Sequence, residues 1–324
     1  MKNFQATTIG PEIPRGYFLI KIHSVFRRAI NLQLFDSYAP SGQKIRQNQG
    51  NECNQPKKRY YGELYSHALV TILSLSLKLN GYPQSICLDS IEDFMAFSLK
   101  PGNTGFLCTD GVTLYSTNPN ATFRFSFTSA TRLNRRTLPR IQHIGTTWQS
   151  SADMLASIQI EHDTDLNIGN IMNGCTKRGV LGEILTKAAV DLGKSVQVEN
   201  TSALRSATLR LLGFGSGLTP SGDDFLCGFI TAAHCQFNRY SNCLFQLKEI
   251  VLANLTKTNS ISASFLQSAT HECVLDSLCN FAEAISNGFK LEESLKQLCT
   301  LGHSSGMDIA TGFLYGLKIW RSEQ

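Results

Sequence analysis

The sequence predicts an α+β protein with a β-rich, mainly antiparallel amino-terminal half and a mainly α-helical carboxy-terminal half. Short alternating apolar runs are confined to the first part of the 324 residues, and helical spacing of apolar residues follows Pro139. The composition, 42% apolar and 17% charged, is typical of a folded chain and excludes a disordered protein or a long charged coiled coil. We expect a β-rich domain over residues 1–145 and a helical domain over residues 146–324.

The clearest strand signal is a hairpin. Residues 105–108 and 112–115 are short apolar runs, and Asp110 and Gly111 between them are typical of a tight turn. Residues 121–127 alternate phenylalanine with smaller or polar residues, which places the rings on one face of a further strand. These patterns predict an antiparallel sheet in the amino-terminal half.

Residues 17–34 mix apolar and basic residues, which predicts a strand followed by a second strand or a short helix. The polar residues 40–59 predict a loop or linker. Later segments space their apolar residues at three and four positions, as amphipathic helices do. These segments are residues 180–192, 244–255, 261–269 and 291–301.

Charge and cysteine usage exclude several function classes. The net charge of +5 is mild and does not predict a nucleic-acid partner. The ten cysteines contain no C-x-x-C pair, so we expect neither a thiolate-held metal nor an iron–sulfur cluster. No secretory signal or membrane-spanning apolar stretch is evident, so we expect a cytoplasmic protein with reduced thiols and no membrane partner.

Residues 213–224, GFGSGLTPSGDD, are the densest group of chemically informative residues. The apolar helical residues 225–233 follow, so this loop should end at a helix amino terminus, where backbone N–H groups, the helix dipole and hydroxyls favour phosphate or carboxylate. No lysine follows the glycines and residues 206–212 look helical, so neither ATP nor NAD is expected. The candidate anion-binding residues are Gly215, Ser216, Gly217, Thr219, Ser221 and Gly222.

The pattern S-G-x-D-x-x-x-G-F of residues 221–229 returns 84 positions later in residues 305–313. Two helices should therefore begin in the same way. If they pack around a pseudo-twofold axis, Asp224, Asp308 and His303 would face one pocket, where an imidazole can act as an acid or base. The second loop adds Ser304, Ser305 and Gly306 to the candidate anion-binding residues.

Structural alternatives exist for the same residues. Ser221 with Asp224, and Ser305 with Asp308, fit the capping-box pattern, and a loop histidine such as His303 is commonly a surface residue. An acidic pair beside an anion needs a metal, a proton or a basic residue between them. No resident cofactor or metal is expected, although a divalent ion at Asp223 and Asp224 is an open alternative.

Three stretches resemble one known family, that of the oxamate carbamoyltransferase subunit of anaerobic allantoin degradation, long catalogued as a domain of unknown function. They are residues 24–32, SVFRRAINL; residues 212–228, LGFGSGLTPSGDDFLCG; and residues 301–308, LGHSSGMD, with Gly312 and Phe313. The resemblance implies an enzyme of this subunit and two others, one similar to succinyl-CoA ligases. The implied reaction converts oxalurate and phosphate to oxamate and carbamoyl phosphate.

That reaction needs a bound phosphate nucleophile, donors at the carbonyl oxygen and an acid for the leaving nitrogen. The resemblance implies that the loop holds the anion and that Asp224 or His303 moves the proton, with Asp223 and Asp308 as further catalytic candidates. Two other functions are open. One is a stand-alone hydrolase or transferase of a small amide or phosphorylated substrate, and the other is a non-catalytic anion-binding or scaffolding subunit.

Overall fold

In the computed structural model the chain divides into two compact units, residues 1–135 and residues 136–324. The predicted loop at residues 40–59 lies outside the described residues. The structure describes residues 1–38, 69–73, 83–88, 90–91, 93–116, 121–142, 145–162, 164–173, 179–236 and 241–321.

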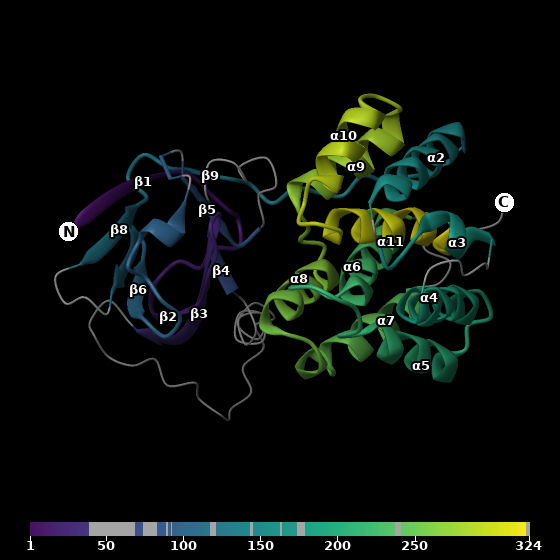
Figure 1. The fold of residues 1–324 in the computed structure, drawn as a ribbon, viewed down its shortest axis with the longest axis horizontal. Helices are drawn as coiled ribbons and strands as arrows, with labels where there is room; N and C mark the ends of the chain where they lie inside the picture. Colours follow the sequence, from purple (N-terminus) through teal and green to yellow (C-terminus); the bar gives the residue numbers. More distant parts are fainter. Residues whose placement is uncertain are drawn as a thin grey trace, which may run out of the picture. The chain divides into compact units, whose positions relative to one another are not determined.

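The strands of the first unit form one sheet that closes on itself (Figure 1). They are β1 Lys2–Ile9, β2 Tyr17–Val25, β3 Ala29–Tyr38, β4 Leu69–Leu73, β5 Ser85–Leu88, β6 Thr104–Cys108, β7 Gly111–Tyr115, β8 Thr122–Ser126 and β9 Thr131–Arg132. The ring runs β1-β8-β7-β6-β2-β3-β4-β5 and returns to β1, which also pairs with β9. Among these described strands, six of the eight pairs in the ring are antiparallel, and β1–β8 and β4–β5 are parallel.

Alternation along the strands fills the interior of this ring. Phe123 and Phe125 of β8 are buried in the core, two positions apart, as the period of two predicts. The predicted hairpin is present as β6 and β7, and Cys108 pairs with Gly111, so the two-residue turn is at residues 109–110. Gly111 opens β7 close to the backbone of Phe125, where a Cβ would lie 2.4 Å from the Phe125 oxygen. Residues 17–34 form two successive strands rather than a strand and a helix.

The second unit is helical, so the predicted α+β division is confirmed (Figure 1). Its helices are α2 Gly145–Glu161, α3 Ile168–Asn173, α4 Val180–Gln197, α5 Thr201–Leu211, α6 Ser221–Cys235, α7 Ser241–Leu252, α8 Ser260–Thr270, α9 Asp276–Asn287, α10 Leu291–Cys299 and α11 Ser305–Trp320. Two short 3₁₀ helices, η2 Phe94–Ala96 and η3 Leu255–Lys257, complete the described elements. Across the described part of the chain, no helix is both long enough and apolar enough to span a membrane.

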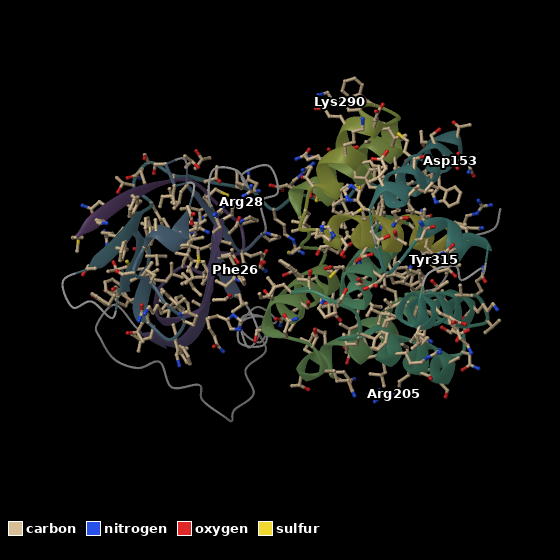
Figure 2. The ribbon with its side chains drawn as sticks, in the orientation of Figure 1. Phe26, Arg28, Asp153, Arg205, Lys290 and Tyr315 are labelled. Atoms are coloured by element: carbon tan, nitrogen blue, oxygen red, sulfur yellow. The ribbon has the colours of Figure 1, made fainter. Side chains whose placement is uncertain are left out.

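Helices α6 and α11 form the centre of the helical unit. All residues of α6 are buried, because α5, α7, α8 and α11 pack around it. The ring of Tyr315, labelled in Figure 2, lies against Phe225 and Phe229 with ring centroids 6.1 Å from each. Trp320 at the end of α11 donates its indole N–H to the Phe229 oxygen at 3.1 Å. The two repeated helices are therefore one packed pair.

Glycines let α6 and α11 approach backbone to backbone. A Cβ on Gly228 would lie 2.0 Å from the Ile309 oxygen, and a Cβ on Gly312 would lie 2.0 Å from the Phe225 oxygen. The two contacts are related by the 84-residue offset of the repeat, because position 225 corresponds to 309 and position 228 to 312. The reciprocal contacts place the repeated helices around a pseudo-twofold axis, as the sequence predicts.

Candidate functional site

The two helices that carry the repeated motif also begin in the same way. Gly213 and Gly302 follow α5 and α10 with positive φ angles of 73° and 63°, which glycine adopts without strain. At the second position of the next helix, Gly222 packs on the end of α5 and Gly306 packs on the end of α10. A Cβ would lie 2.1 Å from the Leu211 oxygen at Gly222, and 1.9 Å from the Leu298 oxygen at Gly306.

Several backbone N–H groups at these helix amino termini are already bonded within the protein. The Gly222 N–H donates to the Phe214 oxygen at 2.9 Å, and the Gly306 N–H donates to the Leu301 oxygen at 3.0 Å. The N–H groups of the two residues after Gly222 both donate to the Pro220 oxygen. The structure thus shows that Gly222 and Gly306 allow close packing of the helices. Their predicted contact with an anion stays a prediction.

The capping-box alternative is wrong. Helix α6 begins at Ser221 with Pro220 as its N-cap, and α11 begins at Ser305 with Ser304 as its N-cap. Neither N-cap side chain makes a capping hydrogen bond. The motif serines are each one position inside the helix, and neither has the N-cap position that a capping box requires.

Asp224 is buried at the start of α6 and is held by hydroxyl groups. The Thr219 hydroxyl lies 2.9 Å from Asp224 Oδ2 and 2.7 Å from the Ser305 hydroxyl, which links the Gly-rich loop to both helices. Burial raises the pKa of Asp224 well above its ordinary value, and the charge of Asp308 raises it further, while the hydroxyls of Thr219 and Ser305 oppose the rise. Asp224 therefore keeps its proton to a higher pH than an ordinary aspartate does.

Asp308 is the equivalent residue of α11 and has a different environment. Its side chain is fully buried, and neither carboxyl oxygen has a hydrogen-bond partner among the described residues. Burial raises its pKa well above the ordinary value, opposed by the hydroxyls of Ser221 and Ser304, and the charge of Asp165 adds to the rise. Ser221 crosses to Asp308 just as Ser305 crosses to Asp224, so each aspartate lies near the first serine of the other helix.

Asp223 has a different position and fixes the loop. Its Oδ1 accepts the Gly213 N–H at 2.7 Å, and its Oδ2 accepts the Thr258 hydroxyl. Burial raises its pKa, and the hydrogen bonds from Thr258 and Gly213 oppose the rise. Both oxygens are thus occupied by contacts that hold the loop after α5 and the start of the α8 segment against α6.

The tip of the Gly-rich loop is at the surface. Ser216 and Gly217 are exposed, and the Ser216 hydroxyl donates to Asp165 at 2.8 Å. Gly215 passes directly over the first turn of α6, where a Cβ would lie 2.4 Å from the Ser221 nitrogen. The predicted anion-binding residues are therefore split between an exposed tip and a buried base.

His303 lies apart from the buried carboxyls. It is exposed, and its ring meets that of His162 edge to face with centroids 6.5 Å apart. The structure brings Asp224 and Asp308 together with Thr219, Ser221, Ser304 and Ser305, and it places His303 on the surface beside His162.

Four contributing residues were missed from sequence, namely His162, Asp165, Thr258 and Asn259. His162 and Asp165 belong to a short polar run, HDTD. The density of titratable groups in this run is a signal that could have pointed to it. Asn259 caps α8 and also donates its amide to the Leu218 oxygen at 2.9 Å. Nothing local to the sequence connects these residues to a loop about fifty positions away.

The donor set does not fit a metal. Within the described ranges, no group of three or more His, Cys, Asp or Glu side chains is arranged to hold an ion. Asp223 uses both oxygens elsewhere, which leaves the open alternative of a divalent ion shared by Asp223 and Asp224 without support. What the arrangement offers instead is a pair of buried carboxyl groups among hydroxyls, and their raised pKa values favour the protonated form, which can donate a proton without repelling an anion.

Comparison with known families identifies the region that carries this pair. Residues 211–317 match the family model of the oxamate carbamoyltransferase subunit AllH. The predicted family resemblance is thereby confirmed, and the matched region runs from the end of α5 through most of α11, so it contains both repeated helices. No solved structure matches the chain.

Proposed function

We propose that this chain is a subunit of a carbamoyltransferase that converts oxalurate and phosphate to oxamate and carbamoyl phosphate. The observation that carries the proposal is the buried pair of Asp224 and Asp308, whose pKa values burial raises and which lies inside the region matched by the AllH family. The word subunit in the family description supports partner chains, and two further subunits, one similar to succinyl-CoA ligases, belong to the proposal.

In the proposed reaction a phosphate oxygen attacks the carbamoyl carbon of oxalurate. The bond from that carbon to the inner nitrogen breaks, and the nitrogen takes a proton from the acid and leaves as the amide of oxamate. A carboxyl group that is protonated near neutral pH can supply that proton, and it does not repel phosphate or oxalurate. The exposed loop tip with Ser216 and Gly217, and His303 on the surface, are the proposed contacts for the incoming anions.

The test is turnover by the chain purified with its partner subunits. Phosphorus NMR should detect carbamoyl phosphate formed from oxalurate and phosphate. Asp224→Asn and Asp308→Asn each remove a titrating proton but keep the size of the side chain, and at least one should lower kcat about a hundredfold or more. Asp153→Asn is the matched control, because Asp153 is exposed on α2 (Figure 2) and should leave kcat unchanged.

The outcomes separate the three functions. Turnover that is absent from the intact complex overturns the proposal, and turnover by this chain alone supports a stand-alone enzyme. If both Asn variants retain full kcat and change only the assembly, measured by size-exclusion chromatography, the chain is a scaffolding subunit. Unchanged turnover in both variants with unchanged assembly removes the two aspartates from the mechanism.

A further inference from the structure

Among the described residues, three buried oxygen atoms at the start of α6 and α11 make no hydrogen bond of normal geometry, although the Ser221 and Ser304 hydroxyls lie near Asp308. The three atoms are both carboxyl oxygens of Asp308 and the hydroxyl oxygen of Ser221, whose residues are 0% and 1% exposed. A buried polar group without a partner costs about 1–3 kcal/mol, so three of them in one place are a substantial cost to the folded state. Groups of this kind in native proteins commonly meet a water, an ion or a ligand.

The pseudo-twofold repeat allows the surroundings of Asp308 to be compared with those of Asp224. Asp224 has the position of Asp308 in the other helix, and Thr219 satisfies it at 2.9 Å. Thr219 comes from the longer loop, which places seven residues between Gly213 and Ser221, whereas only His303 and Ser304 lie between Gly302 and Ser305. In the shorter second loop the nearby hydroxyl is that of Ser304, which does not reach hydrogen-bond geometry with Asp308, so the carboxyl group keeps capacity to bind another molecule.

We propose that Asp308 and Ser221 bind the carboxamide group of the substrate and product. A carboxylic acid offers one O–H donor and one carbonyl acceptor side by side, which match the carbonyl oxygen and an N–H of a carboxamide in two parallel hydrogen bonds. The Ser221 hydroxyl supplies a third contact to the carbonyl oxygen or the second N–H. A cation is a poorer match, because burial raises the pKa of Asp308 and so disfavours the charged carboxylate that a cation would need. This assignment rests on the proposed function for the identity of the ligand.

The experiment compares two ligands on the full-length chain by isothermal titration calorimetry. Oxamate has a primary carboxamide, and N,N-dimethyloxamate has the same carbonyl and carboxylate without N–H donors. Wild type should bind oxamate about tenfold or more tightly than the dimethyl compound. In Asp308→Leu, which replaces the carboxyl by an apolar group of similar size, the preference should fall to about twofold or less.

Two further variants sharpen the result. Asp308→Asn keeps a donor and an acceptor side by side, so oxamate should bind within about threefold of wild type even though the variant has no acidic proton to give. Asp153→Asn should retain the full preference for oxamate, because Asp153 is exposed on α2 and has no part in the proposed site. Circular dichroism checks that each variant is folded.

An equal affinity of wild type for both ligands, or no saturable oxamate binding, overturns the inference. A buried water would then be the partner of the three oxygen atoms. A preference that survives Asp308→Leu in a folded protein also overturns it. These results are distinct from failure of the proposed function, which is read from turnover of oxalurate by the complete enzyme. The wild-type ligand comparison needs no variant, so the test does not depend on the folding of Asp308→Leu.

Discussion

Gly228 of α6 and Gly312 of α11 each pack on the backbone of the other helix at equivalent positions. A side chain at either position would overlap a backbone carbonyl oxygen of the other helix. A Cβ would lie 2.0 Å from the Ile309 oxygen at Gly228, and 2.0 Å from the Phe225 oxygen at Gly312. This reciprocal contact sets the distance between the helices. It therefore also determines how closely Asp224 and Asp308 approach, since each aspartate lies one turn before its glycine.

Alanine at Gly228 or Gly312 should destabilise the fold by about 3 kcal/mol, because the added methyl group meets backbone that cannot move without separating α6 from α11. Urea unfolding followed by circular dichroism measures the change. Gly169→Ala in α3 is the control, since its Cβ would meet only the Asn167 side chain, 3.2 Å away. Equal free energies of unfolding for the three variants would contradict the close contact.

The raised pKa values of the buried aspartate pair predict a pH dependence of stability. The pKa values of Asp224 and Asp308 lie well above the ordinary 3.8 in the folded state, so the folded protein binds these protons more tightly than the unfolded chain. Their contribution is fully present below about pH 4 and is lost as pH rises through the raised pKa values. Wild type should lose stability as pH rises from about 4 through these raised pKa values, and Asp308→Asn should lose less. Urea unfolding at several pH values checks this, with Asp153→Asn expected to follow wild type.

His234 near the end of α6 predicts the opposite slope in acid. Burial lowers its pKa from 6.5 to about 4, and the carboxylate of Glu272, 3.4 Å from its Nδ1, only partly opposes that effect. The unfolded chain binds this proton first, so the stability that depends on neutral His234 is present above about pH 6.5 and is lost as pH falls toward 4. The loss should amount to roughly 3 kcal/mol. In His234→Gln the free energy of unfolding should fall less between pH 6.5 and pH 4 than in wild type. An unchanged fall would rule out His234 as its source.

Asp223 should prove structural rather than catalytic. Asp223→Ala leaves the Gly213 N–H and the Thr258 hydroxyl without their acceptor, which should cost about 2–3 kcal/mol of stability. Thr258→Val removes one of the same contacts, so the two substitutions should be less than additive. Chemical unfolding of the single and double variants measures the coupling. Full additivity would show that the two side chains act independently.

The Gly-rich loop, its second copy and the family are readable from sequence because each rests on local residue types. Glycines, hydroxyl residues and an aspartate at fixed spacing mark a helix entry wherever they occur. The hairpin at Gly111 and the phenylalanines of β8 were predictable for the same reason, since turn chemistry and a period of two are local properties.

Local pattern could not separate the roles of three candidate proton-transfer residues, Asp223, Asp224 and His303. Asp223 and Asp224 are adjacent in sequence, yet a helix turns successive side chains by about 100°, so one reaches Thr258 and the other reaches Thr219 and Ser305. His303 precedes α11 by only two residues, and it turns to the surface beside His162.

The sequence alone thus determined the fold class, the repeat and the motif that marks the family, because these depend on composition, periodicity and residue order. Only the tertiary structure decided which carboxyl groups lie together and which of them lacks a partner. Burial and pairing arise from groups far apart in the chain. The pKa of Asp308 and its free hydrogen-bonding capacity follow from packing between α6 and α11 and from the length of the opposite loop.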